Sequence, residues 1–259
     1  MLLEGRTAIV SGIGPGMGRD ISLALAEQGA DLVLGARTIG KCEAVAAEVE
    51  ALGRRAIPVE LDITDPASCE AAARTCLDEL GSIGVLVNNA YHGGTNQAFA
   101  DDDLDEWRAT FEVNTFGTLG MTQAVVPAMK EAGEGRIIMI NTMSTVRIAE
   151  HYGAYAASKN ALAAATKTLA VELGPFGIRV NGIHPGYIWG GPVEFYFEYL
   201  AKERGVTPED VYDEVASETC LKYLPHSSEI AGSVVFFASD LSKPVTGQAL
   251  HVNAGHFLV

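Results

Sequence analysis

Seven short apolar runs, separated by longer segments with the 3.6-residue period of a helix, constrain the fold of this chain more than any other feature. Strands that alternate with helices pair in parallel, and right-handed crossovers place helices on both faces of the sheet. The pattern therefore predicts an α/β fold with a doubly wound, parallel, seven-stranded sheet, and ligands belong at the carboxyl ends of its strands. The runs cover residues 7–10, 31–34, 57–61, 85–87, 137–140, 179–183 and 249–252.

Length and composition agree with a single domain spanning residues 1–259. A chain of 259 residues that is 48% hydrophobic can bury one large core. We find no linker, internal repeat or low-complexity tract that would divide it. The whole chain is therefore expected to fold as one unit.

A glycine-rich turn follows the first run and opens a helical segment. Residues 11–18 read Ser-Gly-Ile-Gly-Pro-Gly-Met-Gly, and the second strand-like run follows at 31–34. Glycines let the backbone approach a pyrophosphate, while the amides and dipole at the start of a helix favour negative charge. In this strand, turn, helix and strand context, the turn indicates a dinucleotide site.

Tyr155 and Lys159 lie four residues apart in an alanine-rich segment without proline, so a helix places both side chains on one face. Moving the pKa of a phenol from about 10 to about 7 requires roughly 4 kcal/mol. A cation about 4.5 Å away, at an effective dielectric constant of about 20, supplies roughly 3.7 kcal/mol. The pair is typical of a proton-exchanging tyrosine, although the same spacing also occurs on solvated helix faces. Its interpretation therefore depends on the other motifs.

Taken together, these motifs resemble the short-chain dehydrogenase/reductase family over essentially the whole chain. The family's TGxxxGxG pattern is matched by Ser11, Gly12, Gly16 and Gly18, with serine in place of threonine. The resemblance implies a Rossmann-type fold, a nicotinamide dinucleotide cofactor and oxidation or reduction at a carbon that bears oxygen.

The resemblance also implies the outline of the cofactor site. Asp62 matches the acid that holds the adenine amino group, and residues 88–90 match the NNAG turn beneath the cofactor, although Tyr91 replaces its glycine. Residues 185–186 match the turn that meets the nicotinamide. The expected cofactor contacts are Ser11, Gly12, Gly16, Met17, Gly18, Arg37, Asp62, Ile63, Asn89, Ala90, Tyr155, Lys159, Pro185, Gly186 and Ile188.

Four residues match the catalytic positions of the family: Asn114, Thr142, Tyr155 and Lys159. Thr142 departs from the pattern, since the family usually carries serine thirteen residues before the tyrosine. Threonine keeps the hydroxyl that donates to the substrate oxygen, but its branched Cβ restricts χ1. Ser144 is the alternative, because two residues apart on a strand it would face the same way, about 6 to 7 Å farther along. We favour Thr142.

Cofactor choice depends on the residues after the second strand, where an acid binds the ribose of NAD and a cation pairs with the 2′-phosphate of NADP. Ala36 occupies the usual position of the aspartate, and Arg37 occupies that of the arginine in many NADP enzymes. Pro15 stands where NADP enzymes often carry a second basic residue. Arg37 could also be a solvated loop residue. We expect NADP to be preferred, with NAD as the alternative.

The segment at about 187–222 is expected to be a lid over the site and to select the substrate. Its many aromatic side chains favour an apolar, cyclic or bulky alcohol or ketone, including steroid-like or terpenoid compounds. Gly190 replaces the family's threonine, so the lid would hold the cofactor less directly. Alternatively, Phe195, Phe197 and Leu200 pack the lid onto the body or a neighbouring subunit. The expected substrate contacts are Ser144, Tyr187, Trp189 and Phe195.

The formal net charge of −15 argues against nucleic acid and against an anionic membrane surface as partners. No run reaches the roughly 18 residues of a membrane span and no signal peptide is recognisable, so we expect a cytoplasmic protein. The four cysteines are expected to be reduced and mostly buried, and the six histidines lack metal-ligand spacing, so no catalytic metal is predicted. The cysteines are Cys42, Cys69, Cys76 and Cys220.

These observations predict reversible hydride transfer between a nicotinamide and a secondary alcohol or ketone, and the resemblance implies a homotetramer. One alternative is a 3-oxoacyl thioester (acyl carrier protein) reductase. Such an enzyme would need a basic surface to dock its acidic carrier protein, and a chain with 18 Lys and Arg but 33 Asp and Glu is poorly suited to form one. The other is a non-catalytic dinucleotide sensor, which would not need the complete set of catalytic residues.

Overall fold

All seven expected strands are present in one parallel sheet, within residues 1–258 that the computed structural model describes. Their order is β3-β2-β1-β4-β5-β6-β7, so the strand order reverses at β1. The predicted fold class is confirmed. The strands are β1 (Thr7–Ser11), β2 (Asp31–Ala36), β3 (Ala56–Glu60), β4 (Val85–Asn88), β5 (Gly135–Ile140), β6 (Ile178–Pro185) and β7 (Ala249–Val252).

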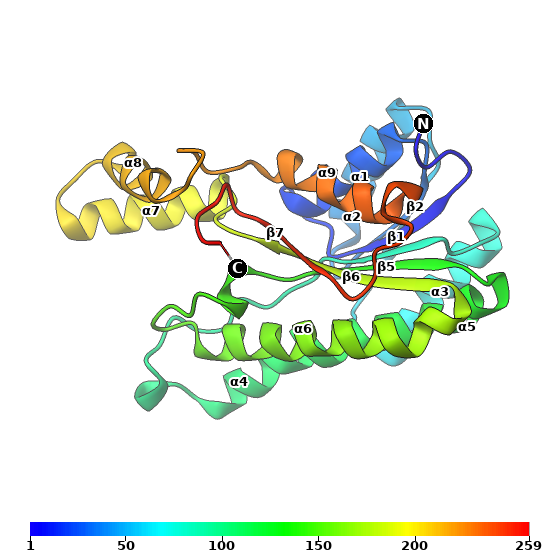
Figure 1. Cartoon of the computed structure of the whole chain (residues 1–259), viewed down its shortest axis with the longest axis horizontal. Helices are drawn as coiled ribbons and strands as arrows, with labels where there is room; N and C mark the ends of the chain where they lie inside the picture. Colours follow the sequence, from blue (N-terminus) through cyan, green and yellow to red (C-terminus); the bar gives the residue numbers. More distant parts are fainter. Residues whose placement is uncertain (259) are drawn as a thin grey trace.

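Two helical layers cover the sheet (Figure 1). Side chains alternate between the faces of a strand, and Ile9 accordingly joins one core while its neighbours Ala8 and Val10 join the other. The core with Ala8 and Val10 lies under α1 (Met17–Glu27), α2 (Ile39–Ala51) and α9 (Ser227–Ala238). The core with Ile9 lies under α3 (Pro66–Leu80), α5 (Thr118–Ala132) and α6 (Gly153–Leu173).

The expected lid consists of α7 (Gly191–Arg204) and α8 (Pro208–Glu218), which extend from one end of the molecule (Figure 1). The two helices share a small core of their own, in which Phe197 and Val211 are fully buried. Phe197 therefore packs within the lid, in a core separate from those of the body. Phe195, in contrast, is 74% exposed and contributes nothing to this core.

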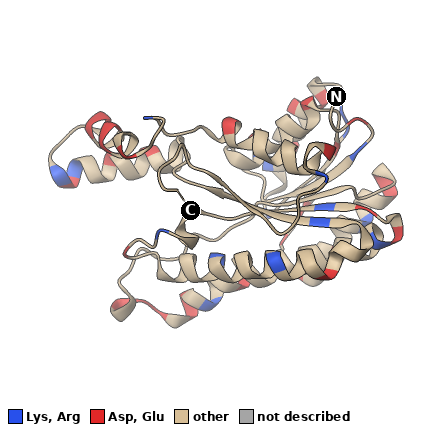
Figure 2. Ribbon diagram, in the orientation of Figure 1, with Lys and Arg blue, Asp and Glu red and all other residues tan. Residues whose placement is uncertain are grey.

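Charged residues are spread over many elements (Figure 2). Lys and Arg occur on strands, helices and connecting segments, and Asp and Glu lie mainly on the outer helices and loops. No helix among residues 1–258 combines the length and the apolar character needed to cross a membrane.

We expect Gly177→Ala to destabilise the fold by at least about 2 kcal/mol, because two costs combine. Gly177 has a φ of 74°, and a Cβ there would collide with the carbonyl oxygen of Gly133 at the end of α5. Gly53→Ala is the matched control: its φ is 78°, but a Cβ there meets nothing within 4 Å, so only the left-handed backbone cost of about 1 kcal/mol remains. Urea unfolding measures the free energy of unfolding of both variants, and an equal loss of stability in the two would contradict the proposed collision.

Candidate functional site

The glycine turn packs backbone to backbone against the turn after β4. Gly12 has a φ of 90°, and a Cβ there would collide with the backbone of Ala90. The Asn89 side chain donates from Nδ2 to the Gly12 carbonyl oxygen at 2.7 Å, and a Cβ on Gly18 would lie 2.5 Å from that same oxygen. Gly16 differs, because a Cβ there would meet no atom within 4 Å. The space beside Gly16, at the start of α1, is therefore open.

Asp62 and Arg37 lie on the neighbouring part of the same edge, after β3 and β2. Asp62 Oδ1 accepts hydrogen bonds from the backbone N and side-chain Oγ1 of Thr64, at 2.9 and 2.7 Å. These bonds lower the pKa of Asp62, and the charge of Arg37 lowers it further. Arg37 is exposed and within electrostatic reach of Asp62, so the predicted adenine and 2′-phosphate positions adjoin.

Asn114 lies in a π-helical turn (Glu112–Gly117) between α4 (Leu104–Phe111) and α5. Its Oδ1 accepts from the backbone N of His92 at 2.7 Å, and its Nδ2 donates to the His92 carbonyl oxygen at 2.8 Å and to Ser158 Oγ at 3.0 Å. Asn114 therefore joins the turn after β4 to α6. Neither His92 nor Ser158 was predicted as a site residue, although Ser158 lies between Tyr155 and Lys159 on α6.

Tyr155 and Lys159 share α6, but burial opposes the expected activation of the phenol. Burial raises the pKa of Tyr155 to about 12, although a hydrogen bond from Thr142 favours the phenolate. Burial also lowers the pKa of Lys159 to about 8, and its Nζ donates to the Ile140 carbonyl oxygen at 2.8 Å. The sequence estimate omitted the loss of solvation, which is the largest influence on the pKa of both groups in this structure.

The hydroxyls of Thr142 and Ser144 lie 3.4 Å apart, so the expected separation of 6 to 7 Å is wrong. That estimate assumed a continuing strand, whereas β5 ends at Ile140 and a 3₁₀ turn, η3 (Met143–Thr145), follows. Thr142 Oγ1 caps this turn by accepting from the backbone N of Ser144 at 3.2 Å. Of the two, it is Thr142 whose side chain lowers the pKa of Tyr155.

Two further tyrosines flank Tyr155. The rings of Tyr91 and Tyr152 lie edge-on to it, with centroid distances of 6.5 and 6.4 Å. Tyr91 replaces the glycine of the NNAG turn and is 62% exposed. Tyr152 was not predicted, although its position three residues before Tyr155, at the start of α6, is a signal for it.

The predicted residues after β6 separate into buried and lid-facing positions. Pro185 ends β6, and a Cβ on Gly186 would lie 2.8 Å from the Cβ of Asn253. Ile188 packs on the core beneath α1 and α9. Trp189 packs on the lid core, with its ring 4.5 Å from that of Tyr212, and Tyr187 contacts this core with its ring 5.9 Å from that of Phe197.

The remaining predicted cofactor residues lie beside the turns already described. Met17 is the first residue of α1 and is partly buried against the core. The Ser11 hydroxyl donates to the Val87 carbonyl oxygen at 3.4 Å. Ile63 is buried in the opposite core. These residues therefore help to fix the turns of the site.

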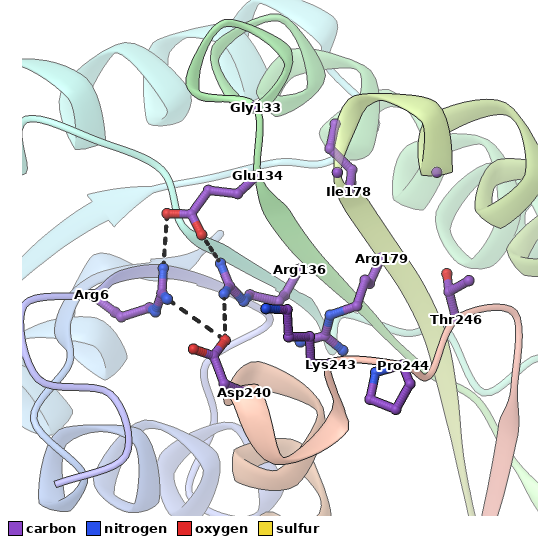
Figure 3. A pocket seen from close by; sticks show the side chains of 12 residues that line it. Arg6, Gly133, Glu134, Arg136, Ile178, Arg179, Asp240, Lys243, Pro244 and Thr246 are labelled. Atoms are coloured by element: carbon purple, nitrogen blue, oxygen red, sulfur yellow. Dashed lines mark hydrogen bonds and ion pairs between the residues drawn. The ribbon is translucent and has the colours of Figure 1, made fainter.

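A cavity of about 480 Å³ lies away from these residues, beside the first residues of β5 and β6 (Figure 3). Arg6 and Arg136 each form ion pairs with both Glu134 and Asp240, which closes a ring of alternating charges. Arg179 is held by backbone carbonyl oxygens, including those of residues 237 and 239. Since these cations already have partners, we interpret the cavity as a structural junction.

The cysteines and histidines among the described residues form no group of three that could hold a metal. Cys42, Cys69 and Cys76 are buried free thiols, whereas Cys220 is exposed. Burial raises the pKa of each of the three buried thiols, to about 11 or 12.

Comparison with known proteins identifies the family. A family model described as "Enoyl-(Acyl carrier protein) reductase" matches residues 12–256. The chain is 36% identical to a 3-alpha-(or 20-beta)-hydroxysteroid dehydrogenase of Mycobacterium tuberculosis, over 98% of this chain and 90% of the relative. It is 32% identical to an L-rhamnose 1-dehydrogenase (NAD(P)(+)) of a Sphingomonas species, over 99% and 98%.

A solved NAD⁺-bound xylitol dehydrogenase superposes with a TM-score of 0.91 at 29% identity, covering 97% of this chain and 99% of that one. The sheet order, the glycine turn and the full-length similarity agree with one another. The chain belongs to the short-chain dehydrogenase/reductase family of NAD(P)-dependent oxidoreductases.

Proposed function

We propose that the protein catalyses reversible hydride transfer between a nicotinamide dinucleotide and a secondary alcohol or ketone. The observation that carries this proposal is that Asn114 and the residues after β5 are both bonded to α6 beside Tyr155 and Lys159: Asn114 Nδ2 donates to Ser158 Oγ, and Asn141 Nδ2 donates to the Lys159 carbonyl oxygen. The first test is a panel of secondary alcohols and ketones, followed through the nicotinamide absorbance. Turnover of no member, with the cofactor bound, would contradict the proposal.

In this proposal each residue of the set acts on one group. Tyr155 exchanges the hydroxyl proton, and Thr142 donates a hydrogen bond to the substrate oxygen. Lys159 supplies positive charge beneath the phenol and holds the nicotinamide ribose, and Asn114 supports a water relay beside Ser158. When bound, the cofactor supplies or accepts the hydride at C4 of its nicotinamide.

The residues present fit such a cofactor. The free space beside Gly16 admits a pyrophosphate, and the first amides of α1 have no partner within the helix. Asp62 is kept ionised by its bonds to Thr64 and can accept from an adenine amino group. Pro185 and Gly186, at the end of β6, would meet the nicotinamide.

The substrate class we favour is an apolar, cyclic or bulky alcohol or ketone. Tyr91, Tyr152 and Tyr187 surround the catalytic tyrosine and the base of the lid, and rings of this kind suit a large apolar surface. The similarity to a hydroxysteroid dehydrogenase supports this class, whereas the rhamnose and xylitol dehydrogenases show that relatives also include enzymes named for polyols and sugars. The panel should therefore pair hydroxysteroids with sugars and include a 3-oxoacyl thioester.

A homotetramer is part of the proposal. We assign its interfaces to three elements on which large apolar side chains are exposed: Phe116 beside Asn114, Val171 on α6 and Leu250 on β7. Light scattering of the purified protein measures the mass directly. A monomer at working concentration would contradict this expectation.

We expect Arg37→Ala to weaken NADPH binding by about 10- to 100-fold and to leave NADH binding nearly unchanged, because Arg37 would pair with the 2′-phosphate. Fluorescence titration with both cofactors measures the change. Arg74→Ala, at an exposed arginine paired with Glu70 on α3, is the control. Equal binding of NADH and NADPH by the wild-type protein would instead make Arg37 a solvated bystander.

A further inference from the structure

We infer that His184 and Thr145 are positioning residues, which hold the Thr142 hydroxyl in place for the reaction. The inference rests on the proposed function and concerns how that function's hydrogen-bond donor is oriented. His184 lies in β6 and Thr145 ends the η3 turn that follows β5, so neither belongs to the predicted catalytic set.

The three residues are joined by consecutive hydrogen bonds. Thr145 Oγ1 donates to the Thr142 carbonyl oxygen at 2.9 Å, and His184 Nδ1 lies 2.9 Å from the same Oγ1. A hydroxyl has one hydrogen, and here it is directed to Thr142. Thr145 Oγ1 can therefore only accept from His184, so Nδ1 must carry the hydrogen and Nε2 of the neutral ring must be unprotonated.

The surroundings keep His184 neutral. Its side chain is buried, its ring centroid lies 4.9 Å from that of His251, and burial lowers the pKa of His184 to about 4. The charges of Lys159 and Lys167 lower it further. The ring borders a cavity of about 240 Å³ that Asn160, Lys167 and Gln248 also line. At neutral pH the imidazole therefore remains a fixed donor to Thr145.

The backbone of Thr142 is thereby held at both ends. Its carbonyl oxygen is tied through Thr145 to β6, and its N donates to Asn141 Oδ1 at 3.0 Å. Asn141 in turn donates from Nδ2 to the Lys159 carbonyl oxygen on α6 at 3.1 Å. These bonds fix the backbone of Thr142 between β6 and α6.

Thr145→Val tests the inference, because valine keeps the shape and removes the hydroxyl. We expect kcat to fall about 10- to 100-fold, with KM and the cofactor Kd unchanged, and Thr145→Ser to restore it. His184→Phe, which keeps a ring and removes the donor, should lower kcat similarly. Thr166→Val is the control: Thr166 lines the same cavity and is buried, but its hydroxyl donates to Leu162 within α6.

A double-mutant cycle separates positioning from general damage. In a Thr142→Val background, Thr145→Val should cause no further loss, because the hydroxyl to be positioned is gone. Three results would overturn the inference. These are an undiminished kcat in Thr145→Val, a full additional loss of kcat in the double variant, and a loss of kcat in Thr166→Val equal to that in Thr145→Val.

A readout without turnover distinguishes this inference from the proposed function. Nitrogen chemical shifts of His184, assigned with His184→Asn, should report hydrogen on Nδ1 at neutral pH in the wild type and a changed distribution in Thr145→Val. Hydrogen on Nε2 alone, or a protonated ring, would overturn the inference even if the substrate panel succeeds. A panel without turnover would instead refute the function and leave the tautomer result to stand.

Discussion

Tyr155→Phe is expected to lower turnover by at least about 10³-fold while the protein still folds and binds its dinucleotide. The substitution removes one oxygen and keeps the ring, which lies edge-on between those of Tyr91 and Tyr152. Proton exchange is assigned to Tyr155 alone, so the variant should lack the group that carries out this step. Steady-state kinetics on an accepted substrate and a fluorescence titration with cofactor measure the two effects separately.

Tyr152→Phe is the matched control for that experiment. The Tyr152 ring also lies edge-on to a neighbouring tyrosine ring, and its burial raises the pKa of its phenol. We expect its removal to alter KM more than kcat, since we place this ring in the wall of the substrate pocket. If Tyr155→Phe retained turnover and Tyr152→Phe lost it, the assignment of the proton-exchanging tyrosine would be wrong. A protein that binds cofactor but turns over nothing in either form would support the sensor alternative.

The sheet and the cofactor turns could be predicted because local sequence patterns determine them. The runs at 7–10 and 249–252 agree with β1 and β7 to within one residue, since hydrophobic periodicity and flanking turns mark a strand locally. The position of the glycine turn follows from the same local pattern, but the close approach of Gly12 to Ala90 could not be predicted from it.

The hydrogen-bond network around the site could not be predicted in the same way. The turn after β5 is accompanied by a bond from Thr142 N to the adjacent Asn141 side chain and by a bond between Thr145 and His184 on β6, and the second of these depends on packing between strands distant in sequence. The π turn at Asn114 similarly accompanies the contact of Gly117 with Ile63, where a Cβ would lie 2.9 Å from the Ile63 side chain. The effect of burial on the pKa values of Tyr155 and Lys159 could not be predicted for the same reason, because solvation depends on the whole enclosure.

Lys159→Met is expected to stabilise the cofactor-free protein by about 1 to 2 kcal/mol at neutral pH while abolishing activity. Burial lowers the pKa of Lys159 from its ordinary 10.5 to about 8, so keeping the ammonium charged in the folded protein costs about 3 kcal/mol. No carboxylate among the described residues forms an ion pair with it. Losing the bond to the Ile140 carbonyl oxygen offsets about 1 to 2 kcal/mol of the gain.

The direction of the pH dependence follows from proton binding. Between about pH 8 and 10.5 the unfolded lysine holds a proton that the folded lysine has released, so stability rises with pH in this window. Below about pH 8 the cost of burying the charge is fully present, and above about 10.5 it is absent. Urea unfolding of the wild type and of Lys159→Met should therefore show a stability difference that is constant below pH 8 and declines towards pH 10.5.

The control for this comparison is Lys167→Met, at an exposed lysine two turns farther along α6. Its charge is hydrated in both the folded and unfolded states, so its removal should leave the stability of the protein and its pH dependence nearly unchanged. A Lys159→Met variant that is less stable than the wild type at neutral pH would contradict the argument, because the bond to Ile140 would then outweigh the cost of burial. The expected result would mean that this lysine is retained for the reaction at the expense of the fold, as a charge held ready beneath the phenol.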